Sequence, residues 1–166
     1  MSEAPSSGKL AVRVREANLD CAADAEAVVM LLDNYSQHEM GSSKPLPDDV
    51  KERLIPGLKA CANTLIFLAF HEGGSEPPKP VGIATCFTAF GTFKAKPIIN
   101  VHDLAVLDGY RGRGIGRQLL ESVQAKAQGM DCGKVTLEVL EHNAPAKGLY
   151  ESFGFKFSYL FGEMAP

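Results

Sequence analysis

Apolar residues alternate with polar ones in some stretches of this chain and recur every three or four positions in others. The first spacing predicts strands and the second predicts helices. Together they predict one strand, two helices, three strands, a helix, a strand, a helix and a last strand, over residues 10–15, 22–35, 48–60, 64–71, 81–89, 98–107, 115–128, 135–140, 143–153 and 155–161. This order is typical of a mixed α/β fold, with helices on both faces of one sheet.

The predicted helices have recognisable faces and ends. Asn143 is a good N-cap, Pro145 suits a first helical turn, and Gly129 and Gly154 each end a helix. The helix over 115–128 places on one face Ile115, Leu119, Val123 and Ala127. The apolar face expected for the helix over 22–35 consists of Ala25, Val28, Val29 and Leu32.

The stretch 98–107 is apolar at nearly every position. Its polar residues are Asn100, His102 and Asp103. A strand that is apolar at both alternating sets of positions is typically covered on both faces. The sequence therefore predicts a central strand here, covered on both sides.

Composition and charge narrow the class of protein. The 166 residues fit one domain, expected over 10–166, after a polar tail at 1–9 that we expect to be disordered and that does not resemble a signal peptide. The net charge of −3 argues against a nucleic-acid-binding face, and no apolar run is long enough for a membrane span. The four cysteines form no Cys-x-x-Cys pair. A reduced cytoplasmic setting is expected.

The segment after the predicted central strand is rich in glycine and arginine. Glycine occupies positions 112, 114 and 116, and three cations, Arg111, Arg113 and Arg117, lie among these glycines. Glycines let a ligand approach the backbone, and the free N–H groups at the start of the following helix favour an anion. The loop therefore suits a phosphate or pyrophosphate, although a glycine-rich turn with solvated arginines gives the same pattern.

Two common phosphate-binding motifs are excluded by spacing. A dinucleotide-binding fingerprint that starts at Gly112 needs glycine at 117, where the chain has arginine. A P-loop needs Gly-Lys followed by Ser or Thr, and no such run exists. Without a P-loop lysine or a pair of magnesium-binding carboxylates, a phosphotransferase is not supported. The spacing of His38, His71 and His142 gives no metal motif.

The loop resembles motif A of the GNAT superfamily of N-acetyltransferases, Arg/Gln-x-x-Gly-x-Gly/Ala, which is met by Arg111, Gly114 and Gly116. The run from Asn143 to Phe155 resembles the fourth helix of that family, with its asparagine, its tyrosine and its closing Gly-Phe. The order of elements is also that of the family. The resemblance is specific over residues 100–155, and implies a mostly antiparallel sheet that opens at the cofactor site.

The resemblance implies acetyl-coenzyme A as the cofactor and assigns residues to it. Backbone groups of Leu104, Ala105 and Val106 would line the acetyl-pantetheine arm, and one N–H there would stabilise the oxyanion of a tetrahedral intermediate. Asn143 and Ala146 would contact the same arm, although capping alone also explains the asparagine. The pyrophosphate would lie against Arg111, Gly112, Arg113, Gly114, Ile115, Gly116 and Arg117.

The resemblance also suggests the two proton-transfer groups. Tyr150 is the candidate general acid for the leaving thiolate, with a packed tyrosine as the alternative. His102 is the candidate base for the attacking amine, with a histidine hydrogen-bonded in the sheet as the alternative. Strand alternation would place His102 and Asp103 on opposite faces. The local pattern resembles diamine and polyamine acetyltransferases, which usually carry glutamate where His102 stands.

The acceptor is the least determined part of the prediction. We expect a primary amine of a small molecule, such as a diamine, a polyamine or an amino acid, with a protein N-terminus or lysine as an alternative. The segment 33–52 holds five acidic residues and two lysines, which either attract a cation or solvate helix ends. The phenylalanines at 87, 90 and 93 either line a pocket or pack a hairpin. A non-catalytic acyl-coenzyme A sensor stays open, and the resemblance makes a homodimer plausible.

Overall fold

The computed structural model describes residues 10–74, 76–160 and 162–165. The expected N-terminal tail at 1–9 lies outside them. In chain order the elements are β1 (Val12–Glu16), α1 (Ala22–Gln37), α2 (Asp48–Ala60), β2 (Thr64–His71), β3 (Lys79–Gly91), β4 (Lys96–Val106), α3 (Ile115–Gly129), β5 (Lys134–Leu137) and α4 (Ala144–Phe153). These bounds confirm nine of the ten predicted elements to within about three residues.

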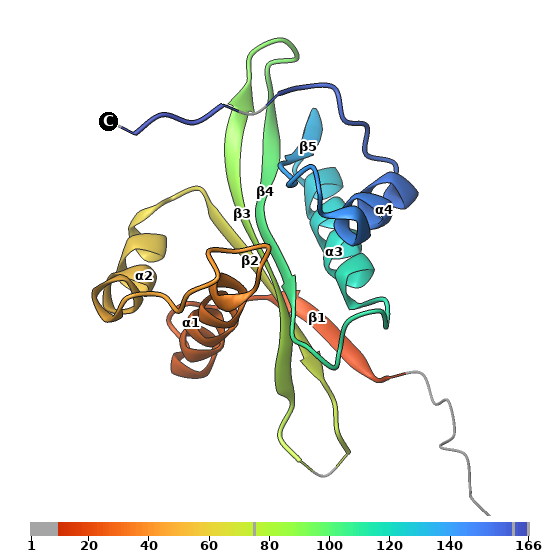
Figure 1. Cartoon of the computed structure of the whole chain (residues 1–166). Helices are drawn as coiled ribbons and strands as arrows, with labels where there is room; N and C mark the ends of the chain where they lie inside the picture. Colours follow the sequence, from red (N-terminus) through yellow and green to blue (C-terminus); the bar gives the residue numbers. More distant parts are fainter. Residues whose placement is uncertain (1–9, 75, 161, 166) are drawn as a thin grey trace, which may run out of the picture.

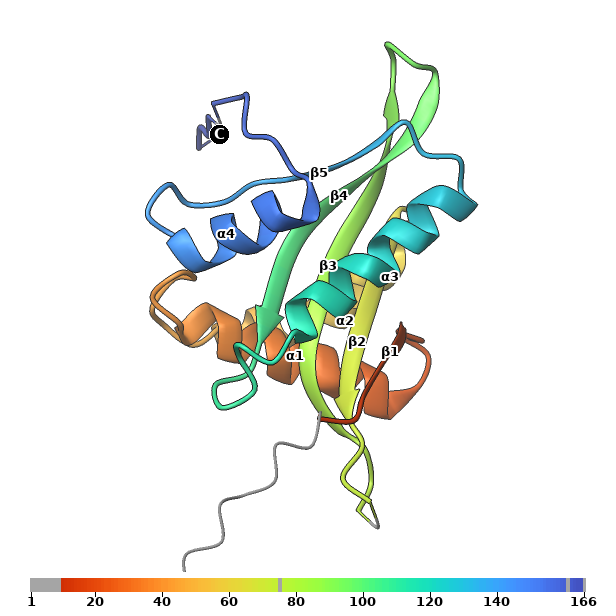
Figure 2. The same cartoon turned by 90° about the vertical axis from the view of Figure 1, so that its right-hand side faces the viewer.

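The strands form one sheet in the order β1-β2-β3-β4-β5. Neighbours from β1 to β4 are antiparallel, and only β4 and β5 run parallel. Helices α1 and α2 cover one face of the sheet and α3 and α4 lie on the other, as Figures 1 and 2 show. The predicted mixed α/β sheet with helices on both faces is confirmed.

Each face of the sheet has its own apolar core. On the α3 side, Ile115, Leu119, Val123 and Ala127 are buried, as their spacing predicts, against alternate residues of β2, β3 and β4. On the other face, α1 packs against the intervening residues of the same strands. Strand alternation therefore divides the two cores, and β4 passes between them.

The face that α1 buries differs from the predicted one. Val28 and Leu32 are buried as expected, but Ala25 and Val29 are only half-buried. Their places are taken by Ala27, Leu31 and Asp24. The helix is rotated so that Asp24 reaches Arg15 of β1, with two guanidinium-to-carboxylate distances of 2.6 Å.

We expect the Asp24 carboxylate to stabilise the fold. It is 2% exposed and also accepts a hydrogen bond from the Asn18 backbone N–H at 2.8 Å. Asp24→Asn should lower the free energy of unfolding by about 3 kcal/mol, because it leaves the Arg15 guanidinium without its counter-charge. Asp20→Asn, at an exposed carboxylate in the same turn, should change it by less than about 0.5 kcal/mol. Urea titrations of both variants measure the difference, and equal losses would contradict a special role for Asp24.

The same ion pair gives stability a pH dependence. Its hydrogen bonds from Arg15 lower the pKa of Asp24 below its ordinary value. The contribution of Asp24 is therefore fully present above the unfolded value of about 3.9 and is lost as the pH falls through the lower, folded value. Urea midpoints of the parent should fall on acidification through this range, and Asp24→Asn should flatten part of that fall.

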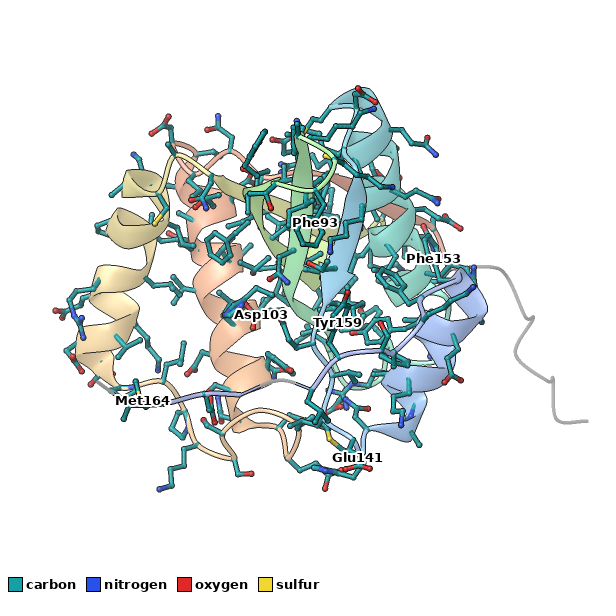
Figure 3. The ribbon with its side chains drawn as sticks, turned by 90° about the horizontal axis from the view of Figure 1, so that it is seen from above. Phe93, Asp103, Glu141, Phe153, Tyr159 and Met164 are labelled. Carbon is teal, nitrogen blue, oxygen red and sulfur yellow. The ribbon has the colours of Figure 1, made fainter. Side chains whose placement is uncertain are left out.

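The predicted last strand, Phe155–Phe161, is wrong for residues 155–160, which belong to no strand; residue 161 lies outside the described part of the chain. Phe155 packs beside Tyr150 and Phe153, which anchors only the start of the segment. Further on, Tyr159 is 91% exposed. Figure 3 shows it on the segment that leads away from α4. Alternation predicts a strand only where a neighbouring edge pairs with it.

Candidate active site

The two parallel strands, β4 and the edge strand β5, separate halfway along β4. Their ladder runs from Ile98 opposite Lys134 to Val101 opposite Leu137, where β5 ends. β4 continues to Val106, and beyond Val101 it pairs only with β3. The backbone of Leu104–Val106 is therefore free of a β5 partner, which leaves an opening in the sheet.

A cavity of about 690 Å³ occupies this opening. Four parts of the chain line it: the end of β4, the glycine loop with the start of α3, one side of α4, and the end of α1 with the loop that follows. The lining residues predicted from the sequence are Leu104, Ala105, Val106, Arg111, Gly112, Gly114, Ile115, Gly116, Arg117, Asn143, Ala146 and Tyr150. The structure thus gathers around one cavity residues that are far apart in the sequence.

The glycine loop presents free backbone donors to this cavity. Gly112 and Gly114 have φ of 72° and 80°, in the left-handed region where glycine is favoured. Gly114 is the N-cap of α3 and offers no side chain to the first N–H groups of that helix. Those groups and the positive end of the helix dipole therefore remain available to an anion.

Arg111 makes a contact that an anion would improve. Its Nη1 lies 2.7 Å from Nε2 of His38, while Nδ1 of the same histidine accepts the Met40 backbone N–H at 3.2 Å. A neutral imidazole that accepts at Nδ1 carries its proton at Nε2, so two donors face each other. A phosphate oxygen between Arg111 and His38 would accept from both. The donor set therefore fits a phosphorylated ligand.

The other two arginines of the loop differ in their surroundings. Arg117 donates to the Ser152 hydroxyl at 2.7 Å and lies over the ring of Phe153, so it ties α3 to α4 beside the cavity. Arg113, which the sequence also assigned to the cofactor, is exposed and is not among the cavity-lining residues. An exposed arginine there still adds positive charge near the loop.

Tyr150 lies in the wall of the cavity and is 6% exposed. Burial raises the pKa of its phenol to about 12, and the nearby Tyr35 adds to the rise. The phenol therefore keeps its proton at neutral pH and serves as a donor. The N-cap of the helix that carries it is Asn143, whose side chain accepts the Ala146 N–H at 3.2 Å. Asn143 therefore caps the helix, and it also lines the cavity.

A β-bulge in β4 determines where His102 and Asp103 lie. Val101 pairs with Cys86 and Asp103 with Thr85, so His102 has no partner on β3. The extra residue places His102 and Asp103 on the same face, which corrects the expectation that alternation separates them. His102 contacts Phe87, which belongs to the α1 and α2 core, with ring centroids 5.6 Å apart.

His102 is exposed on that face, and it does not line the cavity. The expectation that helices cover the central strand on both sides is therefore wrong at this position. Asp103 is half-buried, and burial raises the pKa of its carboxyl while the neighbouring His102 opposes the rise. Figure 3 shows Asp103 between the strands and α1.

The charged residues of segment 33–52 and the phenylalanines at 87, 90 and 93 are the candidate features for acceptor binding. Asp33 accepts the Leu46 N–H at 2.7 Å and lies 3.3 Å from the Lys51 ammonium, and Asp49 pairs with Arg53. These carboxylates hold the loop and the helix ends. The phenylalanines are neither one pocket nor hairpin packing, because Phe87 is half-buried beside His102 whereas Phe90 and Phe93 are exposed.

Sequence reasoning missed the contribution of α1 to the cavity. Tyr35, His38, Glu39 and Met40 line it. Tyr35 is a second phenol there, with a pKa raised by burial and by the charge of Asp103. The signal that could have found these residues is weak: polar and aromatic side chains at the end of a helix, before a loop rich in glycine, serine and proline.

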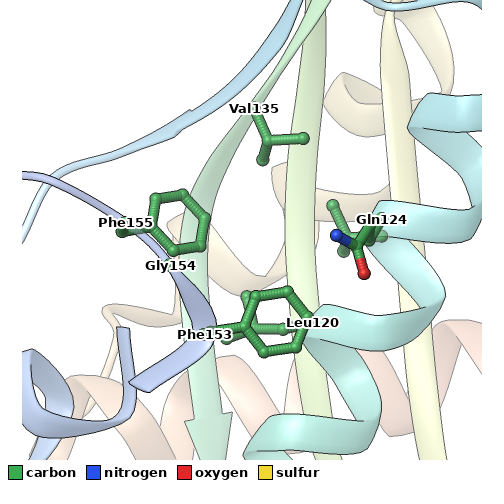
Figure 4. Close-up of a pocket in the computed structure, with 7 residues that line it drawn as sticks. Leu120, Gln124, Val135, Phe153, Gly154 and Phe155 are labelled. Atoms are coloured by element: carbon green, nitrogen blue, oxygen red, sulfur yellow. The ribbon is translucent and has the colours of Figure 1, made fainter. Parts of the chain in front are cut away.

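A smaller apolar cavity, of about 240 Å³, lies apart from this site between α3, β5 and the end of α4 (Figure 4). Leu120, Val135 and Phe153 are among the residues that line it.

Within the described ranges, no cluster of His, Cys, Asp or Glu could hold a metal ion. Among the same residues, no helix has the length and hydropathy of a membrane span.

The model of the acetyltransferase (GNAT) family matches residues 30–155. The chain is 32% identical over 82 residues to a bovine thialysine N-epsilon-acetyltransferase, which covers 49% of this chain and 48% of that protein. It is 33% identical over 97 residues to N-alpha-acetyltransferase 30 of Saccharomyces cerevisiae, a match that covers 55% of this chain and 51% of that protein. A spermine/spermidine N(1)-acetyltransferase of Bacillus subtilis is 30% identical over 92 residues, with 48% and 60% covered.

The chain spans about half the length of the first two of these relatives. Solved structures resemble it along nearly its whole length. A ribosomal-protein-alanine N-acetyltransferase from Brucella melitensis has a TM-score of 0.73 at 18% identity and covers 93% of this chain and 99% of its own. A possible acetyltransferase from Clostridium difficile has a TM-score of 0.76 at 18% identity, with 93% and 97% covered. At this identity the likeness shows the fold.

Proposed function

Because the chain belongs to the acetyltransferase (GNAT) family, we propose that it transfers the acetyl group of acetyl-coenzyme A to a primary amine of a small molecule. One observation carries the proposal. The cavity in the opened sheet joins the phosphate-suited glycine loop at one end to the Tyr150 phenol at the other. A ligand with a pyrophosphate and a long arm that ends in a reactive group suits this arrangement.

The residues of the cavity fit that cofactor in three parts. The N–H groups at the start of α3, with Arg111, His38 and Arg117, would hold the pyrophosphate. The side of Leu104–Val106 that has no β5 partner would bind the arm, which would lie where a further length of strand is missing. Acetyl-coenzyme A supplies an acetyl group activated as a thioester. A backbone N–H of Leu104–Val106 would donate to its carbonyl oxygen and stabilise the charge that develops there.

Two side chains move protons. An alkyl amine has a pKa of about 10.4 and is mostly protonated at neutral pH, so His102 accepts its proton, directly or through a water molecule. Tyr150 donates to the departing sulfur. Because its pKa of about 12 lies above that of an ordinary thiol, about 8.5, the phenol acts chiefly as a hydrogen-bond donor to the sulfur, and a proton that it transfers is replaced from the solvent.

The role of His102 predicts a pH-dependent defect. His102→Gln should lower kcat/KM for an alkyl amine by about thirtyfold at pH 7, because the amine loses its proton acceptor. The defect should shrink to a few-fold near pH 10, where most of the amine is already neutral. His142→Gln removes an exposed histidine before α4 and serves as the control. A defect in His102→Gln of the same size at every pH would contradict the role of base.

The acceptor class is tested by competition between amines. Thiol release from acetyl-coenzyme A should be compared for diamines, polyamines, amino acids and a peptide with a free N-terminus, at equal concentrations. The proposal predicts the highest kcat/KM with a small amine. A preference for the peptide would favour a protein N-terminal acetyltransferase, as two relatives are named.

One further alternative and three further expectations remain with the proposal. A non-catalytic sensor would bind coenzyme A without turnover, and the buried protonated phenol of Tyr150 favours an enzyme over it. The family resemblance supports a homodimer in a cytoplasmic setting, which light scattering and localisation would test. The expectation of one acetyltransferase domain from residue 10 onward is tested by limited proteolysis.

A further inference from the structure

An amide and a carboxylate meet on the α1 and α2 side of the sheet, at the point where β4 and β5 separate. The Asn100 side-chain nitrogen of β4 donates to the Thr136 hydroxyl at 3.1 Å and to the Glu138 carboxylate at 3.2 Å. An amide nitrogen has two hydrogens, so both are directed at the β5 segment. Asn100 therefore holds the Glu138 carboxylate at the base of the opening.

Register places Glu138 beside the candidate base. Val101 and Leu137 form the last pair of the parallel ladder, so His102 and Glu138 are the next residue on each side. Val101 and Leu137 belong to the core under α3, so the residues that follow them face the other way. The contact of His102 with Phe87 and the bond of Glu138 to Asn100 agree with this placement.

The Glu138 carboxylate is available to a ligand. Glu138 and His102 are both exposed. Among the described residues no lysine, arginine or histidine pairs with Glu138, whereas eight other carboxylate contacts to cations are formed. An oriented, unpaired carboxylate beside a catalytic opening is suited to a cation of the substrate.

We propose that Glu138, positioned by Asn100, binds a second cationic group of the acceptor, which makes a diamine or polyamine the preferred substrate. The inference rests on the proposed acetyl transfer and specifies its acceptor. A carboxylate paired with the reacting ammonium would hold the proton that must leave. Pairing with a second ammonium attracts the acceptor and leaves the attacking amine, which lies further along β4, free to lose its proton to His102 through a water molecule.

The spacing along β4 agrees with an acceptor of this kind. Leu104, the first residue of β4 that lines the cavity, is two residues beyond His102. Two residues of a regular strand span about 7 Å and the bulge at His102 makes the span shorter, which brings it close to the roughly 6 Å between the nitrogens of an extended four-carbon diamine. One amine at Glu138 therefore leaves the other near the cavity, where Leu104–Val106 and Tyr150 meet.

The test compares 1,4-diaminobutane with 1-aminobutane, which lacks the second amine, at saturating acetyl-coenzyme A. The parent protein should favour the diamine by about thirtyfold in kcat/KM, the contribution of one charge-assisted contact. Glu138→Gln keeps the shape and removes the charge, and should reduce the preference to about twofold or less. Asn100→Ala should reduce it in the same direction but by less, because the carboxylate stays while its orientation is lost.

The matched control is Glu141→Gln, an exposed carboxylate three residues further along the same segment. It should keep the parent's preference, which separates the local contact from a general loss of negative charge. Thermal midpoints should be equal in the two glutamine variants. A preference that survives Glu138→Gln, or one that Glu141→Gln removes equally, would overturn the inference.

A binding measurement separates this inference from the proposed function. The coenzyme A-bound protein is titrated with each amine while the backbone amide signals of Asn100, His102 and Glu138 are followed by NMR. Saturable shifts with the diamine, absent in Glu138→Gln, support the cation site even when no thiol is released, and the failure then belongs to the proposed function alone. Equal shifts with both amines, or none with either, would overturn the cation site.

Discussion

Replacing Tyr150 with phenylalanine should lower kcat by about a thousandfold while the dissociation constant of coenzyme A changes by less than about threefold. The phenol lies in the cavity wall, is buried and keeps its proton at neutral pH because its pKa is about 12. Phenylalanine preserves the packing against Phe155 and removes only the hydroxyl, the proposed donor to the departing sulfur. Steady-state kinetics and calorimetric titration with coenzyme A give the two quantities.

Tyr35→Phe is the matched control for Tyr150→Phe. Tyr35 lines the same cavity and has a phenol whose pKa burial also raises, but its hydroxyl faces the Met40 carbonyl at 3.4 Å. We expect Tyr35→Phe to reduce kcat by less than about tenfold, since it removes no donor to the sulfur. If Tyr150→Phe keeps its rate, Tyr150 is a packed residue and has no part in the chemistry.

Gly114→Val should weaken coenzyme A binding by about a hundredfold. Gly114 has φ of 80° and caps α3 where its first N–H groups are free, so a branched side chain disturbs the backbone that we propose binds the pyrophosphate. A Cβ there meets no protein atom within 4 Å, so the added side chain has room and the expected effects come from the backbone conformation. Titration calorimetry with coenzyme A measures the loss.

Gly109→Val separates this effect from backbone strain. Gly109 has φ of 79° and also has no protein atom within 4 Å of a Cβ, but it does not line the cavity. Both variants should lose about 1–2 kcal/mol or more of stability, since a left-handed residue with a side chain is strained. Only Gly114→Val should lose coenzyme A affinity. Equal losses of affinity would mean that the loop acts as a structural turn.

Most of the fold follows from local patterns. The α3 face and the capping residues Asn143 and Gly154 lie where the spacing predicts, because helix periodicity and caps depend on residues within one or two turns. The segment after Gly154 has strand alternation but forms no strand in residues 155–160. Pairing depends on an edge elsewhere in the chain, and no local signal reports it.

The parts of the candidate site that lie in one continuous segment could be predicted from the sequence. The parts that depend on the register between strands could not. The glycine loop and Tyr150 could be identified from two motifs. The β-bulge at His102 shifts a side chain from one face to the other, and only the pairing of Val101 with Cys86 and of Asp103 with Thr85 reveals it. The bond between Asn100 and Glu138 depends on the register of β5 in the same way.

The most direct test of acetyl transfer is the release of free thiol from acetyl-coenzyme A by the purified protein, with and without 1,4-diaminobutane. The proposed function predicts slow release without the amine, and saturable release with it that is matched mole for mole by N-acetylated diamine. Tight binding of coenzyme A with no amine-dependent release, from this diamine or any other amine of the panel, would contradict an acetyltransferase of small amines and favour a sensor or a protein acceptor.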